Sequence, residues 1–322
     1  VAAGFSRMAV RVFFGGCILL AGALRSQNLI PNPGFESHRR CPATLGNLED
    51  DLWSWGAPTL GSTDYFHACS ADMGTPENFN GEQRPKEGEA YAGFYAFAPN
   101  NYREYLQVRL RRRLEEGKEY RFTAYLRLFE RSDYALRSLG LLFSNRPLRE
   151  ATRKVLSKKR QLAHEKNRYH FLKLDAPGAL SRRQEWGQIQ ITFEALGTER
   201  YLILGNFEPD ERTLKDVTGR SSNKGSYYYL DQVGLTPAGA GEGDAPVFEL
   251  DSLYTLPALL FAFDSAVLTE EGRLQLEDLA ALLRDRPGLT IELRGHTDAR
   301  GSAAYNLELS ENRCRTVADF LR

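Results

Sequence analysis

Apolar and polar side chains alternate along much of the chain after residue 27. In residues 119–129, EYRFTAYLRLF, alternate positions from Tyr120 to Leu128 are apolar, which is the period of a strand with one face against a core. The pattern recurs in three further segments, residues 188–196, 200–207 and 227–235. Gly, Asn, Asp and Pro separate these segments, and strands do not alternate with long helices, so we expect an all-β sandwich or barrel, with the sandwich favoured.

The alternation stops at residues 236–250, TPAGAGEGDAPVFEL. This Gly-, Ala- and Pro-rich segment has no apolar period and indicates an interdomain linker. We therefore expect a β-sandwich domain at 28–235 and a second domain at 251–322.

The second domain combines strand and helix patterns. Residues 258–265 and 289–293 are expected to be strands, and each precedes a segment with helical spacing. Thr269 can cap the first helix, and Ser310 can cap the second. The predicted order is βαβα.

A dense basic run covers residues 146–173. It is expected to be a helical insertion or a solvated loop, and a solvated charged surface is favoured over contact with an anionic glycan.

The N-terminus has the pattern of an export signal. Two arginines precede an apolar run at residues 12–24, which is short for a membrane span. This predicts a signal peptide at 1–27, cleaved near Ser26 or Gln27. Cys17 lies inside the apolar run, whereas a lipidated cysteine would follow it, so we expect Cys17 to leave with the signal.

Composition narrows the function classes. The 322 residues contain 42 basic and 42 acidic side chains, and mean hydropathy is −0.44. Zero net charge argues against a globally basic nucleic-acid binder, and the hydropathy argues against a multi-span helical membrane protein. In an oxidising compartment Cys41 and Cys69 are the candidates for a disulfide, while Cys314 fits a helix core. Cys and His show no zinc-site spacing.

Two charged residues of the second domain suggest a ligand site. Arg313 falls in the first turn expected for the second helix, where the helix dipole disfavours a cation. Asp298 follows the strand at 289–293. An acid and a base flanking one pocket suit a zwitterion; the alternative is a mutual structural salt bridge.

Three fragments of the second domain are distinctive: FAFDSAVL at 261–268, IELRGHTDARGS at 291–302 and YNLELSENRCRTVADFL at 305–321. They resemble the OmpA-like peptidoglycan-binding domain. The resemblance implies that Asp298 and Arg313 hold the free amino-acid head of diaminopimelate in the peptidoglycan stem peptide. It also implies an α+β fold whose final strands are missing after Arg322. The further contact residues that it implies are Asn306, Thr297, Phe263, Asp264 and Leu309.

The first domain resembles the galactose-binding-like jelly roll of carbohydrate-binding modules, on the segments NLIPNPGFE at 28–36 and YYYLDQVGL at 227–235. The resemblance implies a structural calcium ion held by Glu36 and Asp231; the alternative is that both are merely solvated or hydrogen-bonded. Aromatic side chains are needed to stack on a sugar. The candidates are Trp53, Trp55, Tyr65, Phe66 and Trp186.

Together these features predict a non-enzymatic protein of the periplasm or outer membrane of a diderm envelope. It would bind peptidoglycan and display its sandwich to a glycan or an envelope protein, with no required cofactor and no nucleic-acid partner. One alternative is a glycan-active enzyme with a carboxylate pair, although no nucleophile motif such as G-x-S-x-G is present. The other is a peptidoglycan-anchored outer-membrane barrel, which the arginines at 109–113 disfavour.

Overall fold

The computed structural model describes residues 8–13, 28–219, 225–238 and 253–256, discontinuous stretches between 261 and 294, and residues 303–321. The chain divides into two units, residues 26–241 and a unit formed by residues 1–25 with 242–322. Among the described residues, no helix combines the length and apolar character needed to cross a membrane.

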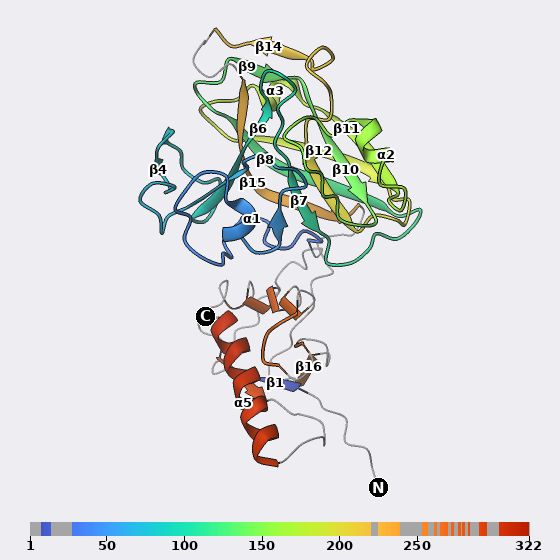
Figure 1. Ribbon diagram of the computed structural model, residues 1–322. Helices are drawn as coiled ribbons and strands as arrows, with labels where there is room; N and C mark the ends of the chain where they lie inside the picture. Colours follow the sequence, from blue (N-terminus) through green and yellow to red (C-terminus); the bar gives the residue numbers. More distant parts are fainter. Residues whose placement is uncertain are drawn as a thin grey trace. The chain divides into compact units, whose positions relative to one another are not determined.

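The larger unit is a sandwich of two antiparallel sheets (Figure 1), as the alternating pattern predicts. The first sheet has the order β11 (Tyr169–Asp175), β10 (Ser138–Ser144), β13 (Tyr201–Gly205), β7 (Leu106–Arg109) and β2 (Trp55–Gly56). The second has the order β12 (Gly187–Glu194), β8 (Glu119–Leu128), β15 (Ser226–Pro237), β6 (Ala90–Phe97) and β3 (Asp64–His67).

Short elements connect these strands. The helices are α1 (Leu48–Asp51), α2 (Lys158–Leu162) and α3 (Pro177–Leu180). Two small ladders pair β4 (Glu77–Asn78) with β5 (Gly81–Glu82), and β9 (Tyr134–Leu136) with β14 (Lys215–Val217).

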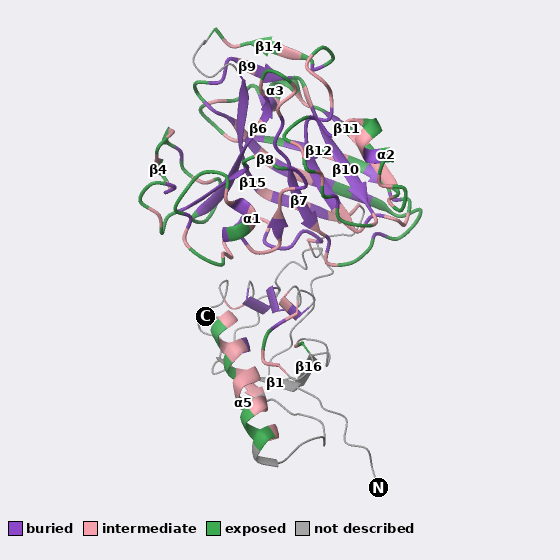
Figure 2. Cartoon of the chain, in the orientation of Figure 1, coloured by how far each residue is buried: buried purple, intermediate pink, exposed green. Residues whose placement is uncertain are grey.

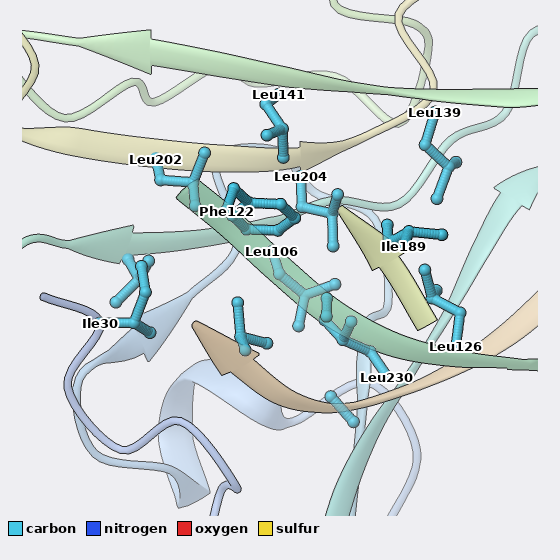
Figure 3. Close-up of a cluster of buried hydrophobic side chains, with 14 of the residues drawn as sticks. Ile30, Leu106, Phe122, Leu126, Leu139, Leu141, Ile189, Leu202, Leu204 and Leu230 are labelled. Carbon is cyan, nitrogen blue, oxygen red and sulfur yellow. The ribbon is translucent and has the colours of Figure 1, made fainter. Parts of the chain in front are cut away.

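The main core lies between the two sheets. Strand β8 supplies alternate side chains to it, from Tyr120 to Leu128, all of which are buried. Figure 3 shows Leu141 and Leu204 of one sheet close to Phe122 and Ile189 of the other. A buried aliphatic or aromatic side chain contributes about 1.5–3 kcal/mol relative to an exposed one, so this interface dominates the stability of the sandwich.

Part of each outer face of the sandwich is also covered by a buried cluster, which the sequence pattern did not predict. Phe66, Tyr91, Tyr227 and Tyr229 form a buried aromatic cluster with Met73 and Phe129, outside the main core. Figure 2 accordingly shows the sheet strands mostly as buried.

The other outer cluster changes the interpretation of the basic run at 146–173. Leu148 and Leu156 of this run are fully buried in the second outer cluster. The run contains α2 and the first residues of β11, and most of its charged side chains remain exposed or half-buried. It is therefore neither one helical insertion nor a simple solvated loop, because Leu148 and Leu156 pack on the sandwich.

The two ends of the sandwich segment meet. Leu29 N–H donates to the Leu235 carbonyl over 2.8 Å, and the Asn28 amide donates to the Val233 carbonyl over 2.9 Å. A further link near the opening segment is the predicted Cys41–Cys69 disulfide, which is confirmed.

The smaller unit contains a three-stranded sheet with the order β16 (Leu253–Leu256), β1 (Met8–Phe13) and β17 (Thr290–Arg294), followed by α5 (Ala303–Phe320). Strand β17 confirms the strand predicted at 289–293.

The segment predicted as a strand at 258–265 has a different geometry where it is described. Phe261 forms an isolated bridge with Leu268, and Ala262 N–H donates to the Val267 carbonyl over 3.1 Å. Phe261 and Ala262 therefore lie antiparallel to Val267 and Leu268, on the two sides of a turn in the chain.

The first predicted helix has its expected cap. The Thr269 hydroxyl accepts the Gly272 N–H over 3.0 Å, and the described residues between 272 and 283 are helical.

Strand β1 falls within the segment expected to be an export signal. It pairs antiparallel with both β16 and β17. The signal peptide remains a prediction, and the processed protein would lack this strand.

Candidate functional site

Helix α5 carries the arginine that the sequence singled out, but not in the predicted position. The helix begins at Ala303, so Ser310 is an interior residue, and its hydroxyl donates to the Leu307 carbonyl over 2.8 Å. The predicted N-cap is wrong. Arg313 consequently lies near the middle of the helix, and the argument from an unfavourable first-turn cation no longer applies.

Arg313 instead connects α5 to the turn at 261–268. Its Nε donates to the Ser265 carbonyl over 2.9 Å, and its guanidinium carbon lies 5.1 Å from the centroid of the Phe261 ring. A guanidinium at this distance from an aromatic face is in the range of a cation–π interaction. The half-buried side chain is therefore held by a carbonyl and a ring at a fixed place on the helix.

Two other predicted contact residues share the Arg313 face of the helix. Asn306 and Leu309 precede Arg313 by seven and four residues, which places the three on neighbouring turns of one side. All three are half-buried. The remaining predicted contacts lie outside the described residues: Asp298, Thr297, Phe263 and Asp264.

Apolar side chains in the C-terminal half of α5 pack against the rest of the smaller unit and fix the helix. Leu268, Leu276 and Val317 are buried together, with Phe261, Leu293, Cys314, Phe320 and Leu321 packed around them. The expectation that Cys314 is a small packing residue agrees with this, since Cys314 carries no disulfide.

The two predicted calcium ligands lie close enough for their charges to interact. Asp231 is fully buried, and its carboxylate accepts the N–H groups of Lys86, Glu87 and Gln232 over 2.7–3.2 Å. The Glu36 carboxylate accepts main-chain N–H groups of residues 89 and 90. Burial, with the nearby charge of Glu36, raises the pKa of Asp231 to about 8.

These two carboxylates fit a hard cation. Oxygen ligands are those that calcium prefers, and a buried acid with a raised pKa lacks a compensating positive charge. Peptide N–H groups occupy part of the lone-pair capacity of both carboxylates. Further oxygen ligands would have to come from main-chain carbonyls or water.

The aromatic candidates for sugar stacking are mostly inaccessible. Trp55, Tyr65 and Phe66 are buried. Trp53 is half-buried with the Arg39 guanidinium 4.4 Å from its ring centroid, and Trp186 is half-buried with its N–H donating to the Arg84 carbonyl. Only the last two retain a surface on which a sugar could stack.

A buried acid pair was not anticipated from the sequence. Asp64 on β3 accepts the Tyr227 hydroxyl over 2.6 Å, and Glu104 accepts the Tyr102 hydroxyl over 2.6 Å and the Tyr95 N–H over 2.7 Å. Burial raises the pKa of Asp64 to about 6 and that of Glu104, which also senses Asp64, to about 8. Asp64 and Glu104 are 40 residues apart and the Tyr227 partner of Asp64 is 163 residues away, so no local spacing signals the pair.

The structure also brings together three metal-ligating side chains whose spacing in the sequence does not predict a metal site. Ligand atoms of His38, His67 and Cys69 all lie within 4.8 Å of one another. The signal available in the sequence was a histidine close before each disulfide cysteine, His38 before Cys41 and His67 before Cys69.

Comparison with known proteins finds similarity in the C-terminal part of the chain. Residues 260–322 match the OmpA family model. The peptidoglycan-associated lipoprotein of Legionella pneumophila is 35% identical over 101 residues, which cover 26% of this chain and 57% of that protein. Outer membrane porin F of Pseudomonas aeruginosa is 30% identical over 116 residues, covering 35% of this chain and 33% of that protein. The matches thus span less than two thirds of these relatives.

Solved structures similar to the chain cover about two thirds of it. The CBM22-1 xylan-binding domain from Paenibacillus barcinonensis has 12% identity and a TM-score of 0.35, covering 70% of this chain and all of that one. A stig cyclase from Fischerella has 14% identity and a TM-score of 0.39, covering 66% of this chain and 98% of that one. Similarity at this level supports no functional conclusion.

Proposed function

We propose that this chain is a cell-envelope protein that binds peptidoglycan noncovalently through its C-terminal unit. The observation that carries the proposal is the OmpA family match at 260–322, the segment in which Arg313 is held on α5. The names of the relatives, a peptidoglycan-associated lipoprotein and an outer-membrane porin, support the same location at the outer membrane or in the periplasm.

The ligand group that we propose is the free amino-acid head of diaminopimelate in the stem peptide. Arg313 would donate charge-assisted hydrogen bonds to its carboxylate, and Asp298 would accept from its ammonium. Asn306 and Leu309 would line the approach from the same helix face, with Thr297, Phe263 and Asp264 as further contacts. Because Nε of Arg313 is committed to the Ser265 carbonyl, its terminal nitrogens would face the ligand.

For the sandwich we propose a display role, with a glycan or an envelope protein as its partner. Trp53 and Trp186 are the aromatic side chains that would contribute to a glycan surface. Glu36 and Asp231 would hold a structural calcium ion, which would supply the positive charge that two neighbouring carboxylates need.

We propose that the protein binds its ligands without catalysing a reaction on them. The buried pair Asp64 and Glu104 would be the candidate for acid–base hydrolysis, but both accept hydrogen bonds from tyrosine hydroxyls and main-chain N–H groups. None of the described pockets includes either of them in its lining. A carboxylate that is buried and hydrogen-bonded in this way serves the packing of the sandwich.

Co-sedimentation with purified sacculi tests the proposal. The full chain should sediment with diaminopimelate-containing sacculi, and Arg313→Ala should weaken binding at least tenfold, because an unpaired buried charge costs about 2–5 kcal/mol. Asp298→Ala should have a similar effect. Sacculi with lysine in place of diaminopimelate lack the carboxylate and should bind the wild type weakly.

The matched control is Arg315→Ala on the same helix. Arg315 is exposed and contacts the Asn312 side chain, so its removal changes net charge equally without touching the 261–268 turn. Equal loss for Arg315→Ala and Arg313→Ala would reduce binding to general electrostatics and overturn the proposed site. Circular dichroism of each variant checks that the fold is intact.

A further inference from the structure

The sandwich carries a compact group of soft and borderline metal ligands away from the C-terminal unit. The ring centroids of His38 and His67 lie 4.4 Å apart, and one ligand atom from each lies within 4.8 Å of Cys69 Sγ and of the other. The disulfide bonds Cys41 Sγ to Cys69 Sγ. The group of three ligand atoms therefore has Cys41 Sγ as a bonded neighbour of its sulfur.

His38 is already oriented for coordination. Its Nδ1 lies 3.3 Å from the Glu36 carbonyl oxygen, so a protonated Nδ1 donates to that carbonyl. The lone pair is then on Nε2. A hydrogen bond from the non-ligating nitrogen to a carbonyl is the common way in which proteins fix a metal-binding imidazole.

His67 is held on a rigid element in its neutral form. It is the last residue of β3, opposite Ala90 of β6, and its Nδ1 accepts the Cys69 N–H over 3.0 Å. The neutral ring is the form that binds metals; coordination at His67 gives up the hydrogen bond from Cys69 or replaces it.

The cations beside the site are engaged elsewhere. The Arg40 side chain pairs with Asp51, and the Arg39 guanidinium lies over the Trp53 ring. Both are exposed side chains of the segment between His38 and Cys41. Their positive charge is thus partly compensated and does not block a divalent ion.

We propose that His38, Cys41, His67 and Cys69 form a zinc site that opens when the disulfide is reduced. Two thiolates and two imidazole nitrogens are a complete tetrahedral set for Zn²⁺. While the disulfide is formed, neither sulfur is a thiolate, and only the two histidines remain as ligands. The sandwich then holds zinc only in its reduced state.

The chemistry of the switch is balanced with a protein or small-molecule dithiol as reductant. The dithiol reduces the Cys41–Cys69 bond by thiol–disulfide exchange and leaves as a disulfide, having given two electrons and two protons to the two protein sulfurs. Zn²⁺ then binds both sulfurs and displaces their two protons. Cys69 is exposed and Cys41 is half-buried, so the exchange can begin at the surface.

Cobalt and zinc titration of the full chain tests this site. The protein carries Cys17→Ser and Cys314→Ser, so that every remaining cysteine belongs to the proposed site. After anaerobic reduction with dithiothreitol and removal of the reductant, one equivalent of Co²⁺ should give the thiolate charge-transfer and tetrahedral d–d absorption. One equivalent of Zn²⁺ should displace it. The oxidised protein should show neither absorption.

Substitutions identify the ligands. His38→Ala and His67→Gln should each weaken zinc binding by at least about 100-fold in a chelator competition. Loss of a residue that only hydrogen-bonds a metal ligand already lowers metal affinity by up to that factor. His164→Ala, a histidine paired with Glu150 elsewhere on the sandwich, is the control and should bind as the parent does. Cys41→Ser with Cys69→Ser should bind no cobalt in either redox state.

Several results would overturn the proposal. Equal binding by oxidised and reduced protein would remove the redox dependence, and thiolate absorption unaffected by both histidine substitutions would remove the four-ligand site. Absence of binding by reduced protein that keeps its near-UV circular dichroism would also overturn it. If reduction alone unfolds the sandwich, zinc must restore that dichroism in the parent and fail to do so in His67→Gln; restoration in both would contradict the site.

Discussion

The environment of Glu104 differs strongly from that of an ordinary surface acid. Its side chain is 1% exposed and accepts hydrogen bonds from the Ser62 and Tyr102 hydroxyls and from the Tyr95 N–H, with no cation among these donors. Burial, with the charge of Asp64 nearby, raises its pKa from an ordinary 4.5 to about 8. The folded protein therefore holds this proton over a range in which the unfolded chain releases it.

The raised pKa of Glu104 makes the free energy of unfolding depend on pH. Between about pH 4.5 and 8 the folded state binds more protons at Glu104 than the unfolded state, so the free energy of unfolding falls as pH rises. Asp64, raised to about 6, acts in the same direction at lower pH. Stability from these two groups is fully present below their unfolded pKa values.

Glu104→Gln should remove the part of the pH-dependent loss of unfolding free energy that comes from Glu104. The amide oxygen can accept the Tyr95 N–H, and the amide nitrogen can donate to the Tyr102 and Ser62 hydroxyls. Between pH 5 and 8 we expect the wild type to lose about 2–3 kcal/mol more unfolding free energy than the variant, measured by urea denaturation. Glu194→Gln, an exposed acid on β12, is the control; parallel pH profiles for wild type and Glu104→Gln would contradict the account.

At the scale of elements, the opening segment and β15 each contribute a carboxylate that accepts main-chain N–H groups from residues 86–90. Asp231 lies on β15 and Glu36 on the opening segment, so an ion between them would link the two ends of the sandwich. Calcium should therefore raise Tm, and a calcium chelator should lower it.

The substitution Asp231→Asn separates a calcium effect from a packing effect. The variant removes a charge but keeps an acceptor for the Lys86, Glu87 and Gln232 N–H groups, and calcium should no longer shift its Tm. Differential scanning calorimetry with and without calcium measures this, and Asp216→Asn on β14, whose exposed carboxylate pairs with Arg137, is the control. A calcium shift of the same size in Asp231→Asn would exclude Asp231 as a ligand.

Element patterns explain which parts of the fold could be predicted. Strand β8 alternates strictly, because one face meets the core, and its bounds follow from the sequence. The start of α5 could not be found in this way. Ser310 is a good cap in isolation, but Ala303, Ala304 and Leu307 before it are strong helix formers, so the helix extends through it.

At the scale of the whole molecule, contacts between distant segments limit what a sequence shows. Asp64 and Glu104 are each unremarkable where they stand, and only the pairing of β3 with β6 and the packing of Tyr227 bring them into one network. His38 and His67 are likewise brought together by the fold and not by their spacing in the sequence. Arg313 and Asp298 could be selected because a family pattern spans both, whereas no such pattern marks the acid pair or the two histidines.

Residues 8–13 have two interpretations that cannot both hold in the processed protein. They lie in the predicted export signal, and they also form β1 between β16 and β17. The sandwich does not depend on them, because its first described contacts begin at Asn28 and Leu29, immediately after the expected cleavage point. Removal of the signal should therefore leave the sandwich intact and take the central strand from the small sheet.

N-terminal sequencing of the protein exported by a diderm host decides between them. We expect the first residue to be Gln27 or Asn28, and the main unfolding transition to match that of the uncleaved chain, because the core between the two large sheets is unchanged. Leu19→Asp places a charge in the apolar run and should block processing. An exported protein that retains residues 8–13, with their amides protected from hydrogen exchange, would show that this segment is a permanent strand of the C-terminal unit.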